Sequence, residues 1–117
     1  MQRLGHLPAI SEGRWMFVAS SDEVQEGIPF AIEIEGYSMV LCRVAGDEYY
    51  ATDNLCTHGN ALLSEGWLEG CVIECPLHAG QFDVRTGKAL CAPVEQDLRI
   101  YPVEVRKNEV FVLLPPE

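Results

Sequence analysis

The alternation of apolar and polar positions favours short β-strands along most of the chain. Between residues 30 and 35 (FAIEIE), apolar side chains occupy every second position and glutamates follow two of them. This period of two is typical of a strand with one buried face and one solvated face. Apolar segments predict further strands at 16–19, 39–45, 48–52, 72–74, 81–84, 98–105 and 109–114.

Turn-forming residues separate these segments. Gly36-Tyr37-Ser38, Gly46-Asp47 and Lys107-Asn108 each precede a predicted strand, and Arg85-Thr86-Gly87-Lys88 follows one. Such a succession of hairpins indicates an antiparallel meander, with one short helical turn expected at 21–25. We therefore predict an all-β fold, a small antiparallel β-sandwich or barrel. The pattern places a single domain at residues 15–117 and an N-terminal extension at residues 1–14.

Composition agrees with one globular domain and excludes some partners. The chain has 117 residues, of which 48% are hydrophobic and 22% charged, and its formal net charge is -10. Phosphate binding needs clustered Lys and Arg, so this balance argues against nucleic acid and against an anionic membrane surface. The acidity serves solubility, or it attracts a partner whose docking face is basic.

The N-terminal sequence and the cysteine count bear on the compartment. No apolar stretch is long enough for a signal peptide or a membrane span, and there is no twin Arg, so a cytoplasmic location is expected. Thiols are kept reduced there. Five cysteines are an odd number and too few for a disulfide framework, which makes some of them candidate metal ligands.

Two segments carry that candidate chemistry. They are Cys56-Thr57-His58-Gly59 and Cys75-Pro76-Leu77-His78-Ala79-Gly80, which read C-x-H and C-x-x-H with sixteen residues between them. Each offers one thiolate and one imidazole from a tight loop that follows a predicted strand. A [2Fe–2S] cluster with two Cys on one iron and two His on the other needs two loops that each supply one of each. The sequence therefore predicts Cys56, His58, Cys75 and His78 as the ligands of such a cluster.

A structural zinc site with two Cys and two His is the alternative for these four residues. Zinc fingers usually pair C-x2–4-C with H-x3–5-H, whereas each segment here mixes the two residue types. Of the remaining cysteines, Cys42 and Cys91 are expected to pack as small hydrophobic side chains, and Cys71 to have a structural role. His6 is expected to be solvated.

The two segments resemble the cluster-binding loops of Rieske proteins, and the resemblance covers nearly the whole chain from Trp15 onward. Residues 50–54 (YATDN), 64–70 (SEGWLEG) and 82–90 (FDVRTGKAL) are similar to the ferredoxin components of bacterial aromatic-ring-hydroxylating dioxygenases, of the naphthalene dioxygenase type. The resemblance implies that the two cysteines bind the inner iron. It also implies that the two histidines bind the outer iron at an exposed tip, where electrons enter and leave.

Departures from other Rieske proteins are informative too. Membrane-bound members carry a disulfide between the two loops, and the matching positions here are Ala61 and Leu77. High-potential members place a Ser and a Tyr hydroxyl near the cluster sulfurs, where this chain has Gly80 and Phe82. Hydrogen bonds to the sulfurs stabilise the reduced state. The resemblance therefore implies a reduction potential near the low end of the Rieske range, roughly -150 mV.

The implied function is that of a one-electron carrier and not of an enzyme. It would pass electrons from a flavin-containing NAD(P)H-dependent ferredoxin reductase to a Rieske non-haem iron terminal oxygenase that hydroxylates aromatic compounds. The sequence itself has no G-x-G-x-x-G or phosphate loop, so no nucleotide cofactor is expected. A monomer is expected, docking through Thr57, Gly59, Asn60, Pro76, Leu77, Ala79 and Pro93.

Two other classes of protein are alternatives to this one. An oxygenase subunit needs a further 2-His-1-carboxylate iron site, and only His6 is left unassigned. The small subunit of a nitrite reductase is the other alternative, and relatives of that type often lack the four ligands.

Overall fold

Three antiparallel sheets make up the computed structural model, which describes residues 13–77 and 79–116. The first sheet has the order β1 (Arg14–Ser20), β11 (Glu109–Leu114), β10 (Val103–Arg106). The second has the order β2 (Phe30–Ile34), β3 (Tyr37–Ala45), β4 (Glu48–Asp53), β9 (Ile100–Tyr101). The third has the order β5 (Trp67–Glu69), β6 (Val72–Glu74), β7 (Gln81–Asp83), β8 (Ala89–Cys91). This confirms the predicted all-β antiparallel fold.

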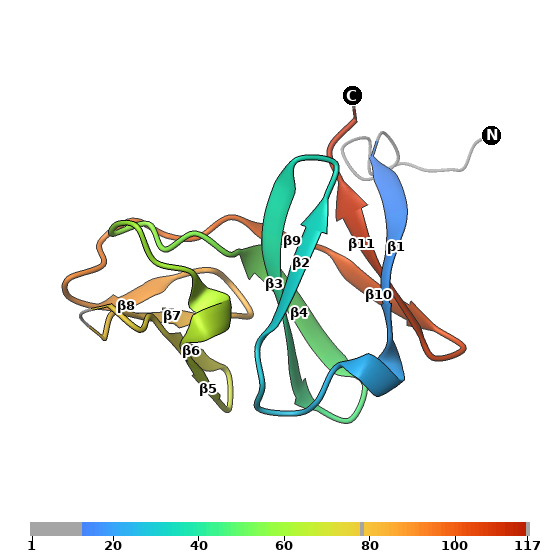
Figure 1. Ribbon diagram of the computed structural model, residues 1–117, viewed down its shortest axis with the longest axis horizontal. Helices are drawn as coiled ribbons and strands as arrows, with labels where there is room; N and C mark the ends of the chain where they lie inside the picture. Colours follow the sequence, from blue (N-terminus) through green and yellow to red (C-terminus); the bar gives the residue numbers. More distant parts are fainter. Residues whose placement is uncertain (1–12, 78, 117) are drawn as a thin grey trace.

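The first two sheets form a sandwich, and the third lies to one side of it (Figure 1). We call the first two sheets the sandwich, and residues 54–99, which include the third sheet, the loop half. Buried side chains of the sandwich form one core: Ala19, Val24, Ile32, Met39, Leu41, Tyr49, Ala51, Tyr101, Val110, Val112 and Leu114. The N-terminal strand β1 pairs with β11 at the end of the molecule away from the loop half.

A second core fills the loop half. Its buried members are Val40, Cys42, Cys56, Leu63, Leu68, Ile73, Cys75, Phe82, Val84, Val94 and Leu98. The two predicted cysteine ligands are thus part of a hydrophobic core. Burying one side chain of this size stabilises the fold by about 1.5–3 kcal/mol, so this core can hold the short strands in place.

Strand β3 is the wall that the two cores share. Met39 and Leu41 face the sandwich core, whereas Val40 and Cys42 face the core of the loop half. Side chains alternate between the two faces of a strand, so a strand covered on both sides is apolar at successive positions. Cys42 is fully buried, as predicted, and burial raises the pKa of its thiol to about 12.

Most predicted strands are confirmed, with two exceptions. The single strand expected at 98–105 is wrong, because Pro102 separates β9, which pairs with β4, from β10, which pairs with β11. Proline lacks the N–H that a continuous ladder needs. The pattern also missed β5 and β8, which are only three residues long each and carry no recognisable alternation.

The turns and helical segments are short. Lys107 and Asn108 both have positive φ, of 49° and 67°, which suits the tight hairpin between β10 and β11. The helical turn expected at 21–25 is a 3-10 turn at Ser21–Glu23, and a second lies at Leu63–Glu65. Within the described residues, neither of these turns nor any other helix has the length and apolar character needed to cross a membrane.

Candidate metal centre

The first predicted ligand loop is a closed hairpin that follows β4. The Cys56 N–H donates to the Ala61 carbonyl at 2.9 Å, and Leu55 pairs with Leu62 across the loop. At the base of the loop, the Leu63 N–H donates to the Asn54 carbonyl at 2.8 Å. This folding points the Cys56 side chain inward, where it is only 2% exposed. His58, two residues later, is exposed.

The second loop follows β6 directly. The Cys75 N–H donates to the Gly80 carbonyl at 2.7 Å, which turns the chain back on itself. Cys75 is buried, at 1% exposure, while Pro76, Leu77 and Ala79 are exposed. The other predicted ligand of this loop, His78, lies outside the described residues. The same is true of His6 and of most of the predicted N-terminal extension.

The two cysteines lie next to each other. Burial raises the pKa of the Cys75 thiol, and its interaction with the neighbouring Cys56 raises that pKa further. Without iron, a thiol in this setting stays protonated at neutral pH, so metal binding must displace the proton. Two adjacent buried thiols, with an exposed His58 two residues after one of them, supply donor types that suit a cluster whose cysteine-bound iron is internal.

The described residues offer the donor types of an iron–sulfur cluster but form no ready-made site for a metal ion. In the part of the chain that the structure describes, no three His, Cys, Asp or Glu side chains are grouped so that they could hold a single ion. A Rieske-type cluster takes only two protein ligands on each iron. Cys56, His58 and Cys75 supply the donor types of that cluster, and their role as its ligands stays a prediction.

A third segment, residues 91–98, joins the two loops, a role for which its sequence pattern has no signal. The Thr57 hydroxyl donates to the Gln96 carbonyl at 2.7 Å, which ties the first loop to the segment. Val94 packs against Gly80 of the second loop, where a Cβ would lie 2.6 Å from the Val94 Cγ1. Glycine is therefore required at this position for the close approach.

Cys91 corrects one expectation. The sequence predicts that it packs as a small hydrophobic side chain, but it is exposed at the end of β8. Its Sγ lies 3.8 Å from Oε1 of Gln81 and 4.0 Å from the Ala79 carbonyl. The strand that carries it, β8, is at the edge of its sheet. Cys71, at the turn before β6, is half-buried.

Gly80 and Phe82 occupy the two positions where high-potential Rieske proteins have hydroxyl groups. Phe82 is fully buried in the core that also holds Cys56 and Cys75. Val94 fills the space beside Gly80. The low reduction potential implied by these two residues stays a prediction.

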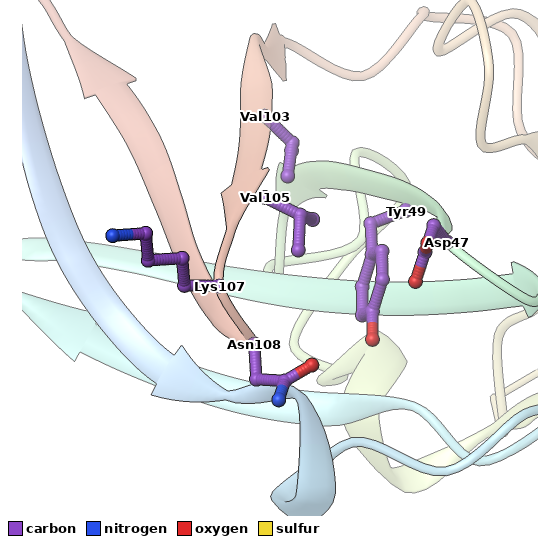
Figure 2. Close-up of a pocket in the computed structure, with 6 residues that line it drawn as sticks. All are labelled: Asp47, Tyr49, Val103, Val105, Lys107 and Asn108. Atoms are coloured by element: carbon purple, nitrogen blue, oxygen red, sulfur yellow. The ribbon is translucent and has the colours of Figure 1, made fainter.

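A surface hollow lies elsewhere, in the sandwich, between the β3–β4 and β10–β11 turns. Its volume is about 340 Å³, and its lining residues are Asp47, Tyr49, Val103, Val105, Lys107 and Asn108. Figure 2 shows the Lys107 side chain extending away from Tyr49 and Asp47. The lining has no Cys or His and is remote in the fold from both ligand loops, so it is not part of the metal centre.

The fold and the paired loops define a Rieske iron–sulfur protein. The profile of the Rieske [2Fe-2S] domain family matches residues 14–102, and the chain belongs to this family. The cofactor of the fold is therefore one Rieske-type [2Fe–2S] cluster, as predicted.

Individual relatives show which kind of Rieske protein the chain resembles. The chain is 50% identical over 99 residues to the ferredoxin component of the naphthalene 1,2-dioxygenase system of Pseudomonas putida, covering 85% of this chain and 94% of that protein. The ferredoxin of carbazole 1,9a-dioxygenase from Nocardioides aromaticivorans IC177 superposes with a TM-score of 0.81 at 38% identity, covering 88% of this chain and 98% of that one. A ferredoxin solved in complex with the oxygenase of carbazole 1,9a-dioxygenase gives a TM-score of 0.81 at 40% identity, over 88% and 95% of the two chains. The predicted resemblance to dioxygenase ferredoxins is confirmed.

Proposed function

We propose that this protein is the ferredoxin of an aromatic-ring dioxygenase system, a carrier of single electrons with no catalytic activity of its own. It takes electrons from a flavin-containing NAD(P)H-dependent reductase and delivers them to the Rieske non-haem iron terminal oxygenase. The observation that carries the proposal is the pair of adjacent buried cysteines, together with an exposed His58 on the loop of Cys56. Half of the aligned residues are shared with a naphthalene dioxygenase ferredoxin, which supports the same function.

Four residues hold the cluster in this proposal: Cys56 and Cys75 on the inner iron, His58 and His78 on the outer iron. When bound, the cluster supplies a reversible one-electron couple. The protein keeps the two sulfur ligands away from water in the loop-half core. His58 is exposed on the first loop, which provides a short route between the outer iron and a docked partner.

The ligand tip is the docking face in this proposal. Asn60, Pro76, Leu77 and Ala79 are exposed there, while Thr57, Gly59 and Pro93 are half-buried. None of these residues carries a charge, and Leu77 is 41% exposed. An uncharged tip on a protein with a net charge of -10 suits brief contacts of small area, with long-range attraction supplied by the surrounding charge. We further propose that the carrier works as a monomer in the cytoplasm.

The spectrum of the purified protein tests the centre directly. We expect a red-brown protein whose EPR signal after dithionite reduction has the low average g value of a cluster with histidine ligands. Anaerobically purified protein that is colourless and carries zinc would overturn the electron-carrier function and leave a structural metal domain.

The substitution Leu77→Asp tests the docking face. A charge at the centre of an apolar contact must be desolvated on binding, so we expect electron delivery to the oxygenase to slow by about tenfold or more. The EPR spectrum should stay unchanged. Ile28→Asp is the matched control, because Ile28 is 54% exposed in the connection before β2, outside both ligand loops. Stopped-flow reduction of the oxygenase measures both, and equal rates for the two variants would place docking elsewhere.

A further inference from the structure

Asn54 is a buried polar residue at the entrance of the first ligand loop. It follows the last residue of β4 and precedes Cys56 by two positions. Its exposure is 1%, and it is one of three buried polar residues among those that the structure describes, the others being Ser21 and Thr52. A buried amide is costly unless its hydrogen bonds are made. What the Asn54 amide binds is therefore informative.

The Asn54 side chain binds the far end of the same loop. Its Oδ1 accepts a hydrogen bond from the Ser64 N–H at 2.7 Å, and its Nδ2 donates to the Ser64 Oγ at 3.0 Å. The main chain adds two bonds, from the Leu63 N–H to the Asn54 carbonyl at 2.8 Å and from the Asn54 N–H to the Ser38 carbonyl at 3.0 Å. Asn54 thus closes the loop at its base and fixes that base to β3.

The preceding residue is anchored separately. The Tyr101 hydroxyl donates to Oδ1 of Asp53 at 2.6 Å, and the Asp53 N–H donates to the Arg99 carbonyl at 2.9 Å. These bonds hold the end of β4, whereas those of the Asn54 side chain lie within the loop half. Asp53 therefore anchors the end of the strand, whereas the Asn54 side chain closes the loop.

We propose that Asn54 is a positioning residue for the iron centre: by clamping Ser64, its side chain fixes the loop that carries Cys56 and His58 and so sets how both ligands face the cluster. The inference rests on the proposed function. Both ligands lie between the two clamped residues, and the loop bond from Cys56 to Ala61 lies there as well. Opening the clamp leaves only main-chain contacts, the Leu63 N–H to the Asn54 carbonyl and the pairing of Leu55 with Leu62, to join the two ends of the loop, so the ligand-bearing hairpin is freer to shift.

The clamp can be removed in two steps. Ser64→Ala removes only the bond to the Ser64 Oγ. Asn54→Leu keeps a side chain of similar size, removes both bonds and leaves the Ser64 N–H without its partner. A lost hydrogen bond costs about 1 kcal/mol, and an unsatisfied buried group costs more. The expected disturbance therefore grows from Ser64→Ala to Asn54→Leu.

The matched control is Tyr101→Phe. It deletes one hydroxyl and its hydrogen bond to Asp53, immediately before Asn54, and leaves the clamp intact. We expect it to lower the melting temperature without any change at the cluster. A variant that merely weakens the fold should behave like this control.

Three measurements on the cluster-loaded protein test the proposal: the EPR line shape after reduction, the reduction potential, and the rate at which a chelator bleaches the visible absorption. We expect bleaching of Asn54→Leu to be about tenfold faster than that of the unaltered protein, with broadened EPR lines and a shifted potential. For Ser64→Ala, we expect all three quantities to lie between those of the unaltered protein and those of Asn54→Leu. Circular dichroism checks that the sandwich is folded at the temperature used.

The outcomes separate this inference from the proposed function. Unchanged EPR, potential and bleaching rate in both variants, with only a lower melting temperature, would overturn the role of Asn54 and leave the carrier function standing. If Asn54→Leu does not fold, Ser64→Ala decides by itself: wild-type values of all three quantities would overturn the proposal. An unaltered protein without the histidine-type EPR signal would remove the carrier function, and the role of Asn54 with it.

Discussion

The sandwich and the loop half are each built around a core of their own, but their strands differ in length. The sandwich has long strands, such as β3 with nine residues and β1 with seven. Every strand of the third sheet has three residues. A strand of that length contributes few ladder hydrogen bonds, so the loop half depends on side-chain packing and on its metal centre for its order.

The difference indicates that the two halves have different roles, with the sandwich supporting the loop half and the loop half holding the iron centre. The sandwich gives β3 a fixed position, and β3 then offers Val40 and Cys42 as one wall of the second core. On that wall the loop half holds two buried cysteines, Cys56 at 2% exposure and Cys75 at 1%. The sandwich thus supplies the long strands, and the loop half, held by its own core, can keep most of its residues in loops around the iron centre.

Loss of a predicted ligand should change the loop half relative to the sandwich most strongly. Cys75→Ser replaces a buried thiolate donor with a hydroxyl, which is a poor ligand for iron, so we expect complete loss of the visible absorption of the cluster. Amide hydrogen exchange in β5–β8 should become faster, because metal binding and local folding are coupled. Exchange in β1, β3 and β11 should stay slow.

Cys42→Ala is the control for this experiment. Cys42 is equally buried in the same core, but it is not a predicted ligand, and the variant should keep its cluster. Loss of protection in β3 of Cys75→Ser as large as that in β6 would mean that the two halves unfold as one unit.

A substitution in the backbone of the loop half should have the next largest effect. At Gly66, a Cβ would lie 1.9 Å from the Glu74 carbonyl oxygen, and a main-chain atom cannot move aside cheaply. We expect Gly66→Ala to destabilise the protein by roughly 3 kcal/mol or more. Its cluster content should fall while the circular dichroism signal of the sandwich persists.

Gly70→Ala is the control for the loss of stability in Gly66→Ala. Gly70 has a positive φ of 58°, but no other atom lies within 4 Å of the place that a Cβ would take, so only backbone strain of about 1 kcal/mol is added. Urea denaturation followed by absorbance and by circular dichroism compares the two variants. Equal midpoints for them would show that the close approach at Gly66 is not important.

The same contrast explains which parts of the fold could be predicted from sequence. Residues 30–34 have large apolar side chains at every second position, Phe30, Ile32 and Ile34, and do form β2. The strand expected at 98–105 was wrong because apolar pattern alone does not show that Pro102 sends the chain from one sheet to another. Strands β5 and β8 exist only through pairing with β6 and β7, and such pairing leaves no local signal in three residues.

The iron–sulfur cluster could be predicted from the sequence for a different reason. Ligand chemistry restricts residue type and spacing in the two predicted ligand loops independently of secondary structure. The cluster is confirmed by the family, and Cys56, His58, Cys75 and His78 as its ligands stay a prediction. The supporting contacts were not readable, because the bonds from Asn54 to Ser64 and from Thr57 to Gln96 join polar residues that many sequences place in loops. Exposure of Cys91 was missed since a cysteine beside apolar residues does not reveal whether its strand is at an edge.

The reduction potential offers a finer test of the loop half. Phe82→Tyr adds a hydroxyl in the core that contains both predicted cysteine ligands. If this hydroxyl donates to a cluster sulfur or a ligand sulfur, about 1 kcal/mol of extra stabilisation of the reduced state raises the potential by about 40 mV. Protein-film voltammetry measures the change.

A control variant places the same hydroxyl in the sandwich. Phe111→Tyr adds the hydroxyl on β11, where the ring of Phe111 packs edge-on against that of Phe17 with 6.0 Å between the ring centroids. The reduction potential of this variant should equal that of the unaltered protein. A starting potential well above zero in the unaltered protein would contradict the low value of roughly -150 mV implied by Gly80 and Phe82.

Acid should have the smallest effect, and it should act on the loop half. Asp83 accepts hydrogen bonds from the Arg85 side chain at 3.1 and 2.9 Å and from its N–H at 2.9 Å. The hydrogen bonds from the Arg85 side chain lower the pKa of this carboxyl. The carboxylate therefore stabilises the fold at pH values above the unfolded pKa of about 3.9, and this contribution is lost as the pH falls through the lower folded pKa.

The effect is small because Arg85 is 54% exposed, so solvent screens most of its interaction with Asp83. We expect Asp83→Asn to lower the urea midpoint at pH 6 and to match the unaltered protein near pH 2. Glu104→Gln, which removes an ion pair with Arg106 whose side chains are 38% and 69% exposed in the sandwich, should lower the midpoint at pH 6 by less. An Asp83→Asn midpoint equal to that of the unaltered protein at pH 6 would mean that the pair with Arg85 adds nothing to the loop half.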